Sequence, residues 1–246
     1  NLNKIMTKFF VTSSILFLFF IQLVSAQEYE KVEGVWNALF LDIPLSNKFV
    51  LRSEFHSRTI DYFNIWDQQI FRPQITYSDS TKIKWTIGYS YLRNFDADIN
   101  ADPRVRNEHN IWEQISYQVP LKKGSFSTWF RLEHRFQEEL PLQKNLSERS
   151  FDLSSRIRVR LTYERPISKS GSKLPINFIF YDEIFTVLNR SGIPYKFNQN
   201  WTFLGFKFKL NDKAIINTGF QKNTILKSTD LFLKNRFWNT ILFYKI

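Results

Sequence analysis

Arginine and glutamate side chains alternate with apolar residues in two segments of the chain that follow one another closely. The charged residues of these segments are Arg131, Glu133, Arg135, Arg156, Arg158 and Arg160. Residues two positions apart on a β-strand lie on the same face, and residues directly opposite one another on paired strands lie about 5 Å apart. We therefore predict a charged ladder across two neighbouring strands, with Glu183 as a further carboxylate partner.

Buried charges need partners of the opposite sign, and this requirement leaves two interpretations of the ladder. In the first, which we favour, interlocked arginine and glutamate side chains fill a narrow lumen and act as a structural plug. In the second, the arginines form an anion-selective constriction, because rings of arginine favour anions in pores. The chain would accordingly be a structural protein or a narrow transport component.

Three histidines supply the only imidazole groups that could serve as a general base. His56 and His109 lie close to glutamates in the sequence, while His134 falls on the apolar face of its segment. Asp182 and Glu183 are adjacent in a predicted strand, so they point to opposite faces and cannot act together. Neither a G-x-S-x-G nor an H-E-x-x-H motif occurs. We predict no catalytic residues, with an enzyme that modifies lipid or lipopolysaccharide at the barrel rim as the alternative.

The chain contains no cysteine, which excludes disulfides, thiolate metal sites and a thiol nucleophile. Asp96, Asp98 and Asp102 could offer oxygens to a calcium ion, but their segment lacks the glycine and the terminal glutamate of an EF-hand loop. We expect a solvated acidic loop there, and we expect neither a metal nor a cofactor.

The N-terminal segment has the sequence pattern of a secretion signal. An apolar run over residues 9–24 closes on the small residues at 25–26. This pattern is typical of a secretory signal, so we predict that residues 1–26 are removed and that residues 27–246 form one exported domain. The only methionine of the chain follows residues 1–5, which we interpret as an upstream extension.

Eleven segments of the exported part place aromatic or branched residues at every second position, as strands of a membrane barrel do. Four show the alternation clearly, at 48–58, 83–94, 126–137 and 152–164. Seven show it less clearly, at 35–41, 66–77, 107–119, 176–188, 197–210, 214–222 and 235–246. Because bacterial single-chain barrels have even numbers of strands, we expect ten or twelve. Either the segment 35–41 is not a full wall strand, or one further strand exists near it.

These segments predict an all-β protein: a closed, antiparallel, up-and-down transmembrane β-barrel of about 10–12 strands, after an N-terminal signal peptide. Short connections should face the periplasm, and the long polar ones at 95–106, 138–149 and 223–234 should lie outside the cell. Tryptophan and tyrosine at strand ends should form an interfacial girdle. Its candidates are Trp36, Trp66, Tyr77, Tyr91, Trp112 and Tyr244.

Composition and charge limit the function classes. Aromatic residues make up 17% of the chain, which argues against disorder. The formal net charge is +11, yet the basic residues recur at every second position within strands instead of forming one contiguous patch, which argues against nucleic-acid binding. A soluble periplasmic carrier similar to a lipocalin is a further alternative, and it requires apolar residues inside and polar residues outside.

Four motifs occur in order over nearly the whole exported part. They are Arg131-Leu132-Glu133-His134-Arg135-Phe136, the alternating Arg156, Arg158 and Arg160, Tyr181-Asp182-Glu183-Ile184-Phe185, and Phe197-Asn198-Gln199-Asn200. With these motifs the chain resembles the domain-of-unknown-function 2490 family, exported barrel-like proteins of Gram-negative bacteria. Trp201 departs from the family pattern where a basic residue is expected, and Ile246 stands where a terminal aromatic residue is common. The resemblance implies an outer-membrane barrel of undetermined function, and it supplies no catalytic residues.

We therefore expect a monomer in the cell outer membrane of a Gram-negative bacterium. Its expected partners are outer-membrane lipid and, during biogenesis, the barrel-assembly machinery. No nucleic-acid partner is expected.

Overall fold

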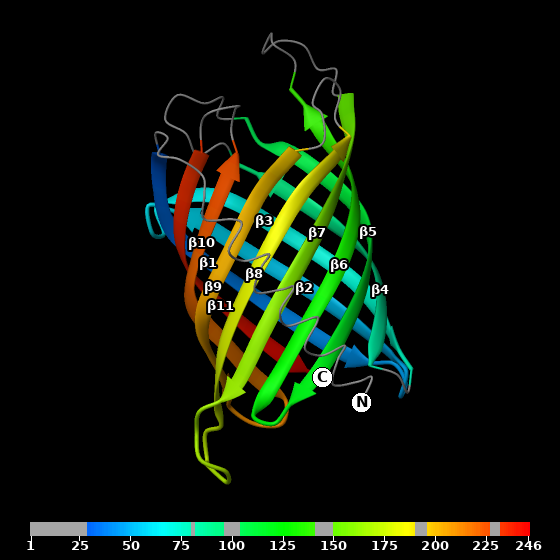
Figure 1. Cartoon of the computed structure of the whole chain (residues 1–246). Helices are drawn as coiled ribbons and strands as arrows, with labels where there is room; N and C mark the ends of the chain where they lie inside the picture. The colour runs from blue at the N-terminus through cyan, green and yellow to red at the C-terminus, as the bar shows by residue number, and fades with distance from the viewer. Residues whose placement is uncertain (1–28, 80–81, 96–103, 141–149, 190–195, 227–231) are drawn as a thin grey trace.

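Eleven β-strands make up the described part of the chain in this computed structural model (Figure 1). That part comprises residues 29–79, 82–95, 104–140, 150–189, 196–226 and 232–246. The strands are β1 (Tyr29–Pro44), β2 (Phe49–Ile60), β3 (Ile65–Ser78), β4 (Ile83–Asn94), β5 (Arg106–Leu121), β6 (Gly124–Glu139), β7 (Ser150–Pro166), β8 (Ile176–Asn189), β9 (Lys196–Lys209), β10 (Ala214–Leu226) and β11 (Phe232–Lys245). Each of the eleven segments predicted from the sequence coincides with one of these strands, although the segments 48–58, 197–210 and 235–246 extend one residue beyond theirs, and the predicted signal segment 1–26 lies outside the described residues. Within the described residues, no helix has the length and apolar character needed to cross a membrane.

The alternation along β7 explains the two different faces of the wall. Arg156 and Arg158 are buried on the inner side, Arg158 with 5% of its surface exposed. Val159, the next residue, is 38% exposed on the outer side, next to the exposed ring of Phe130 in β6. Because a strand turns successive side chains to opposite faces, the sequence period of two produces a polar interior and an apolar exterior.

The sheet closes into a barrel because β1 pairs with both β2 and β11 (Figure 1). All other neighbouring strands are antiparallel, whereas β1 and β11 run parallel, from Tyr29 opposite Phe232 to Asp42 opposite Lys245. The prediction of a closed β-barrel of about 10–12 strands is confirmed, but the expected even number and wholly antiparallel pairing are wrong: the described barrel has eleven strands, and β1 is a full wall strand parallel to β11. An all-antiparallel ring needs an even number of strands, but one parallel pair closes an odd ring with evenly spaced, slanted hydrogen bonds.

The outer surface carries most of the exposed large apolar side chains. They include Phe49, Phe55, Phe71, Ile87, Ile111, Phe130, Val159, Leu204, Phe220 and Trp238. This distribution is the reverse of the one that a lipocalin-like carrier requires. Polar groups also occur on this surface, for example where the carboxylate of Asp182 accepts hydrogen bonds from Asn200 and Thr202 at 3.0 and 2.8 Å.

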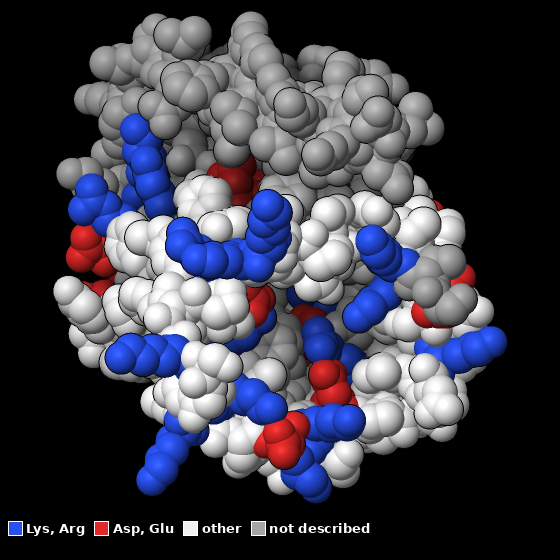
Figure 2. All heavy atoms as spheres, turned by 60° about the horizontal axis from the view of Figure 1, so that its bottom comes forward, with Lys and Arg blue, Asp and Glu red and all other residues white. Residues whose placement is uncertain are grey.

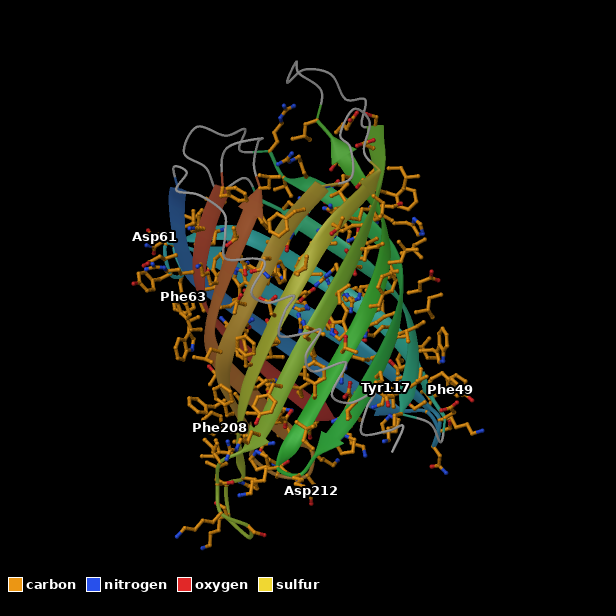
Figure 3. All side chains as sticks on the ribbon, in the orientation of Figure 1. Phe49, Asp61, Phe63, Tyr117, Phe208 and Asp212 are labelled. Carbon is orange, nitrogen blue, oxygen red and sulfur yellow. The ribbon has the colours of Figure 1, made fainter. Side chains whose placement is uncertain are left out.

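The two ends of the barrel differ in their connections. The turns at one end are mostly short, except for residues 167–175, which project beyond the strands (Figure 1). Near this turn end, Phe49 and Tyr117 point away from the barrel wall (Figure 3). Asp61 and Phe63 lie in the short turn between β2 and β3 at the opposite end (Figure 3).

The predicted girdle of tryptophan and tyrosine side chains is only partly present. Trp66 and Tyr244 are exposed near strand ends. Trp36 and Trp112 are instead buried on the inner side, Trp112 with only 1% of its surface exposed. The prediction is wrong for these two residues because each occupies an inward position of its strand, where its ring contacts an arginine.

Candidate functional site: the charged lumen

The barrel encloses a cavity of about 1380 Å³ that is lined by side chains from every described strand. Seen from the turn end, lysine and arginine side chains surround a hollow whose wall also carries charged groups (Figure 2). Strands β2 to β8 contribute most of the charged lining, and we call this part of the wall the charged sector. Strands β9, β10, β11 and β1 contribute mainly amide and apolar side chains and form the neutral sector.

Two buried glutamates hold three arginines at the centre of the charged sector. Glu133 accepts hydrogen bonds from Arg156 at 2.5 and 2.9 Å and from Arg158 at 2.7 Å. Glu183 accepts hydrogen bonds at 2.7 Å from Arg158 and from Arg160. Both carboxylates are almost fully buried, at 1% and 0% exposure. Arg158 therefore bridges two carboxylates, and each of these also has an arginine of its own.

Two further glutamates hold arginines of other strands in the charged sector. Glu108 in β5 accepts a bidentate pair of hydrogen bonds from Arg135 at 2.7 and 2.8 Å. Glu54 in β2 accepts hydrogen bonds from Arg72 at 3.1 Å and from Gln74 at 2.6 Å. Paired and hydrogen-bonded charges of this kind are the form in which proteins tolerate buried ions.

Two inner arginines are held by a glutamine instead of a carboxylate. Arg58 donates to Gln68 at 2.6 Å, and Arg131 donates twice to Gln114, at 2.9 and 2.8 Å. Arg58 forms no ion pair among the described residues. The nearest oxygen of Glu133 lies 3.6 Å from Arg131, beyond hydrogen-bonding distance.

Each of these two arginines also lies over a buried tryptophan ring. The guanidinium carbon of Arg58 is 3.9 Å from the centre of the Trp36 ring, and that of Arg131 is 3.8 Å from the centre of the Trp112 ring. The ring of Trp36 also stacks on Phe237, with ring centres 4.2 Å apart. Cation–π contacts are strongest where water is excluded, so the rings hold both guanidinium groups against the wall.

The absence of a side chain at Gly88 makes room for Trp112. A Cβ atom at this position would lie 2.2 Å from an indole carbon, while the indole nitrogen donates to Ser90 at 3.0 Å. We expect Gly88→Ala to displace the indole and to lower the free energy of unfolding by about 1 to 3 kcal/mol, as overpacking of a core does. Urea-induced unfolding in phospholipid vesicles measures the difference, with Ser53→Ala on the outer side of β2 as the control. An unchanged free energy of unfolding would contradict this packing.

Amide groups dominate the hydrogen bonds of the neutral sector. The buried side chain of Gln221 accepts hydrogen bonds from Tyr181 at 2.9 Å and from Asn239 at 2.6 Å. It donates to Asn223 at 2.8 Å. This side of the lumen therefore offers dipoles without net charge, opposite a wall that carries arginine.

The structure places all seven residues of the predicted charge network on the inner side of the barrel. Six of them cluster around Glu133 and Glu183, whereas Arg135 pairs with Glu108. Sequence reasoning missed Glu108 and Glu54 as members of the charged sector. For Glu54 the signal was present, because it occupies the charged set of alternate positions in the segment 48–58.

The three histidines lie apart from one another. His56 is on the inner side beside a glutamate. His109 and His134 are on the outer side, where the Nδ1 atom of His109 is 2.6 Å from the hydroxyl of Tyr89. The Nδ1 atom of His134 is 3.0 Å from the hydroxyl of Ser155. The last contact brings a hydroxyl and an imidazole together on the outer face.

The carboxylates considered at the sequence level are also separated. Asp182 and Glu183 lie on opposite sides of the wall and bind different partners. Within the described residues, no cluster of histidine, aspartate and glutamate has the arrangement of a metal site. The candidate calcium ligands Asp96, Asp98 and Asp102 lie outside the described residues.

Comparison with known protein families matches residues 33–232 to the family described as "Protein of unknown function (DUF2490)". The match begins within β1, includes β2 to β10 whole and ends at the first residue of β11, so it covers most of the described barrel. No curated protein and no solved structure matches the chain.

Proposed function

The chain belongs to the DUF2490 family of proteins of unknown function, and on this premise we propose that it is a β-barrel of the Gram-negative outer membrane whose lumen is a narrow path for small anions. The arginine and glutamate network braces the wall around this path. The proposed partners are outer-membrane lipid and, during biogenesis, the barrel-assembly machinery. The protein is proposed to act as a monomer.

The apolar outer face supports insertion into a membrane. The rings of Phe55 and Phe71 lie on neighbouring strands with centres 5.1 Å apart, and the two residues are 44% and 40% exposed. Soluble monomers rarely expose contiguous apolar patches larger than a few hundred Å². The strands are 12 to 17 residues long, which exceeds the roughly 9 to 11 residues that a tilted strand needs to cross a bilayer.

Fractionation of cells tests the membrane assignment. We expect the protein to sediment with outer membranes and to stay there after a wash with high salt or alkaline carbonate, because its apolar outer face contacts lipid directly. The immunoblot signal of the pellet before and after the wash is the measurement. Release of the protein into the supernatant would contradict the assignment and favour a soluble form.

The observation that carries the anion path is the presence of two cavity-lining arginines, Arg58 and Arg131, that are bound by glutamine and not by a hydrogen-bonded carboxylate. Their positive charge is therefore less compensated than that of the arginines paired with glutamate. Arginine that lines a pore favours anions over cations.

Single-channel recording in planar bilayers tests the path. Under a potassium chloride gradient we expect a reversal potential on the anion-selective side, and Arg158→Ala should shift it toward cation selectivity. The shift follows because Glu133 and Glu183 would lose the cation they share. Arg236→Ala, at an exposed ion pair with Glu33, is the matched control and should keep the wild-type value. Cation preference or absence of current in the wild type would contradict the proposal.

A second candidate function is an enzyme that acts on lipid or lipopolysaccharide, and the observation that favours it is the contact between Ser155 and His134. A serine hydroxyl activated by an imidazole can attack an ester carbonyl while the imidazole takes the proton, which releases the alcohol and leaves an acyl-serine for water to hydrolyse. The pairing of β7 with β8 shifts register directly after Ser155, and irregularities of this kind are common beside active sites.

A fluorophosphonate probe tests the second candidate. If Ser155 is a nucleophile, the folded wild-type protein becomes labelled and Ser155→Ala does not. Ser154→Ala, which changes the neighbouring buried serine, is the control and should label like the wild type. Absence of labelling in the wild type would contradict the enzymatic candidate.

A further inference from the structure

We propose that Arg58 and Arg131 form two binding stations for a small oxyanion, a carboxylate or a phosphate, inside the lumen. The inference rests on the proposed function, since it names the class of solute for that same path. It depends on the surroundings that the two arginines share, on the donors they leave unused and on the type of residue that holds them.

The two arginines lie in equivalent surroundings although they belong to β2 and β6. In each case a guanidinium group lies over an inner tryptophan and donates to the side-chain oxygen of a glutamine, and we call this arrangement an Arg–Trp–Gln unit. The first unit consists of Arg58, Trp36 and Gln68, and the second consists of Arg131, Trp112 and Gln114. The other arginines that contact Glu133 or Glu183 have a carboxylate as their partner instead.

Each unit leaves a donor without a hydrogen-bond acceptor. The Nε atom of Arg58 and the Nη1 atom of Arg131 are buried and lack a hydrogen-bond partner, and so does the indole nitrogen of Trp36. The Nη1 atom of Arg131 faces Oε1 of Glu133 at 3.6 Å, which is an ion-pair contact without a hydrogen bond. A buried donor without an acceptor is unfavourable, and more so when it carries charge. An oxyanion that enters the cavity would add negative charge beside both guanidinium groups, and a small shift of the side chains would bring its oxygens to the buried donors.

Glutamine is the feature that separates these units from ordinary ion pairs. Its oxygen orients the guanidinium group but adds no negative charge, whereas Glu133 accepts hydrogen bonds from Arg156 and Arg158 and only approaches Arg131 to 3.6 Å. Gln68 is itself fixed, because its amide nitrogen donates to Asn94. The tryptophan covers one face of the guanidinium group, so the free donors lie along the edge.

The edge of a guanidinium group matches two oxygens of one anion. Arginine presents its N–H groups in a plane, and a carboxylate or phosphate can accept two parallel hydrogen bonds there. A chloride ion offers no such pair of oxygens. The units therefore favour oxyanions over halides of the same charge.

Replacing the glutamines tests the inference without removing the arginines. Gln68→Glu and Gln114→Glu keep the size of the side chain and put a carboxylate where the amide oxygen lies, so that each unit becomes an arginine–glutamate pair. The full folded chain in detergent is titrated with sodium phosphate and, separately, with sodium acetate by isothermal titration calorimetry at constant ionic strength. Binding should weaken by about tenfold or more in each variant, as expected for loss of a hydrogen bond to a charged group.

Asn217→Asp is the matched control, because it adds the same charge on the neutral sector of the cavity wall. It should bind the anions nearly as tightly as the wild type does. Binding of acetate alone would identify a carboxylate as the ligand class, and binding of phosphate alone would identify phosphate. No binding of either anion, or equal affinities in Gln68→Glu, Gln114→Glu and Asn217→Asp, would overturn the inference.

The bilayer and binding measurements test the anion path and the binding stations separately, so one proposal can be contradicted while the other is supported. Anion binding that depends on the glutamines, together with a wild type that carries no anion-selective current, would contradict the path and leave the stations supported. Anion-selective current together with binding that ignores both glutamine replacements would contradict the stations and leave the path supported.

Discussion

Arg158→Ala should lower the free energy of unfolding by about 3 to 5 kcal/mol, the range for breaking a buried ion pair by removing one partner. Arg158 donates to Glu133 and to Glu183, both at 2.7 Å. Its guanidinium carbon also lies 4.4 Å from the centre of the Phe185 ring. The alanine variant leaves two buried carboxylates with one fewer cation and opens a space between them, and both changes act in the same direction.

Urea-induced unfolding of the barrel in phospholipid vesicles measures this loss. Arg236→Ala serves as the control, because Arg236 and Glu33 form an exposed pair at 3.9 Å. Exposed pairs contribute about 0 to 1 kcal/mol, so the control should unfold close to the wild type. A loss below about 1 kcal/mol for Arg158→Ala would mean that the network does not brace the wall.

A double-mutant cycle separates the two carboxylates that Arg158 binds. Adding Glu183→Gln to Arg158→Ala should cost less than the sum of the two single changes, because the first change has already removed the partner of the second. Residues in one buried network show coupling energies of about 0.5 to 3 kcal/mol. Additive effects would instead indicate that Arg158 and Glu183 stabilise the barrel independently.

The sequence was sufficient to predict the strands and, where the alternation is clear, their inward faces, because both follow from a period of two. In β7, every second residue from Arg156 to Arg160 is charged, and only one face of a strand can place such residues inside. The inward orientation of Glu133 was predicted in the same way, from the alternation along β6. Local pattern determines which face a residue takes, so these positions needed no knowledge of the rest of the chain.

The number of strands and the parallel closure could not be predicted in this way. Whether β1 meets β11 depends on two segments about 200 residues apart, and neither carries a local signal for its partner. Because bacterial single-chain barrels have even numbers of strands, the eleven segments counted in the sequence were interpreted as one too many or one too few. The structure keeps all eleven because a parallel pair closes the ring.

The alternation along each strand also could not predict which carboxylate or glutamine binds each arginine. Arg135 belongs to the same alternating set as Glu133, yet it pairs with Glu108 on the other neighbouring strand. The two tryptophans beneath Arg58 and Arg131 were assigned to the girdle because the sequence shows only that they lie in predicted strands. Their role depends on register between strands, and register is a property of the folded sheet.

Val159→Arg is expected to destabilise the barrel in lipid by about 2 to 4 kcal/mol, the cost of an arginine at the lipid-facing midplane of a membrane barrel. Val159 lies near the middle of β7 and is 38% exposed on the outer side, whereas its neighbour Arg158 is buried inside. One step along the strand thus separates a position that requires a guanidinium group from one that should reject it.

Ile167→Arg, just beyond β7 and already exposed, is the control, because the cost of a charge falls to about 0 to 1 kcal/mol near the membrane interface. Unfolding in phospholipid vesicles measures both variants. Equal stability of Val159→Arg and the wild type would mean that the middle of the outer face is in water, which would contradict the proposed insertion in the outer membrane.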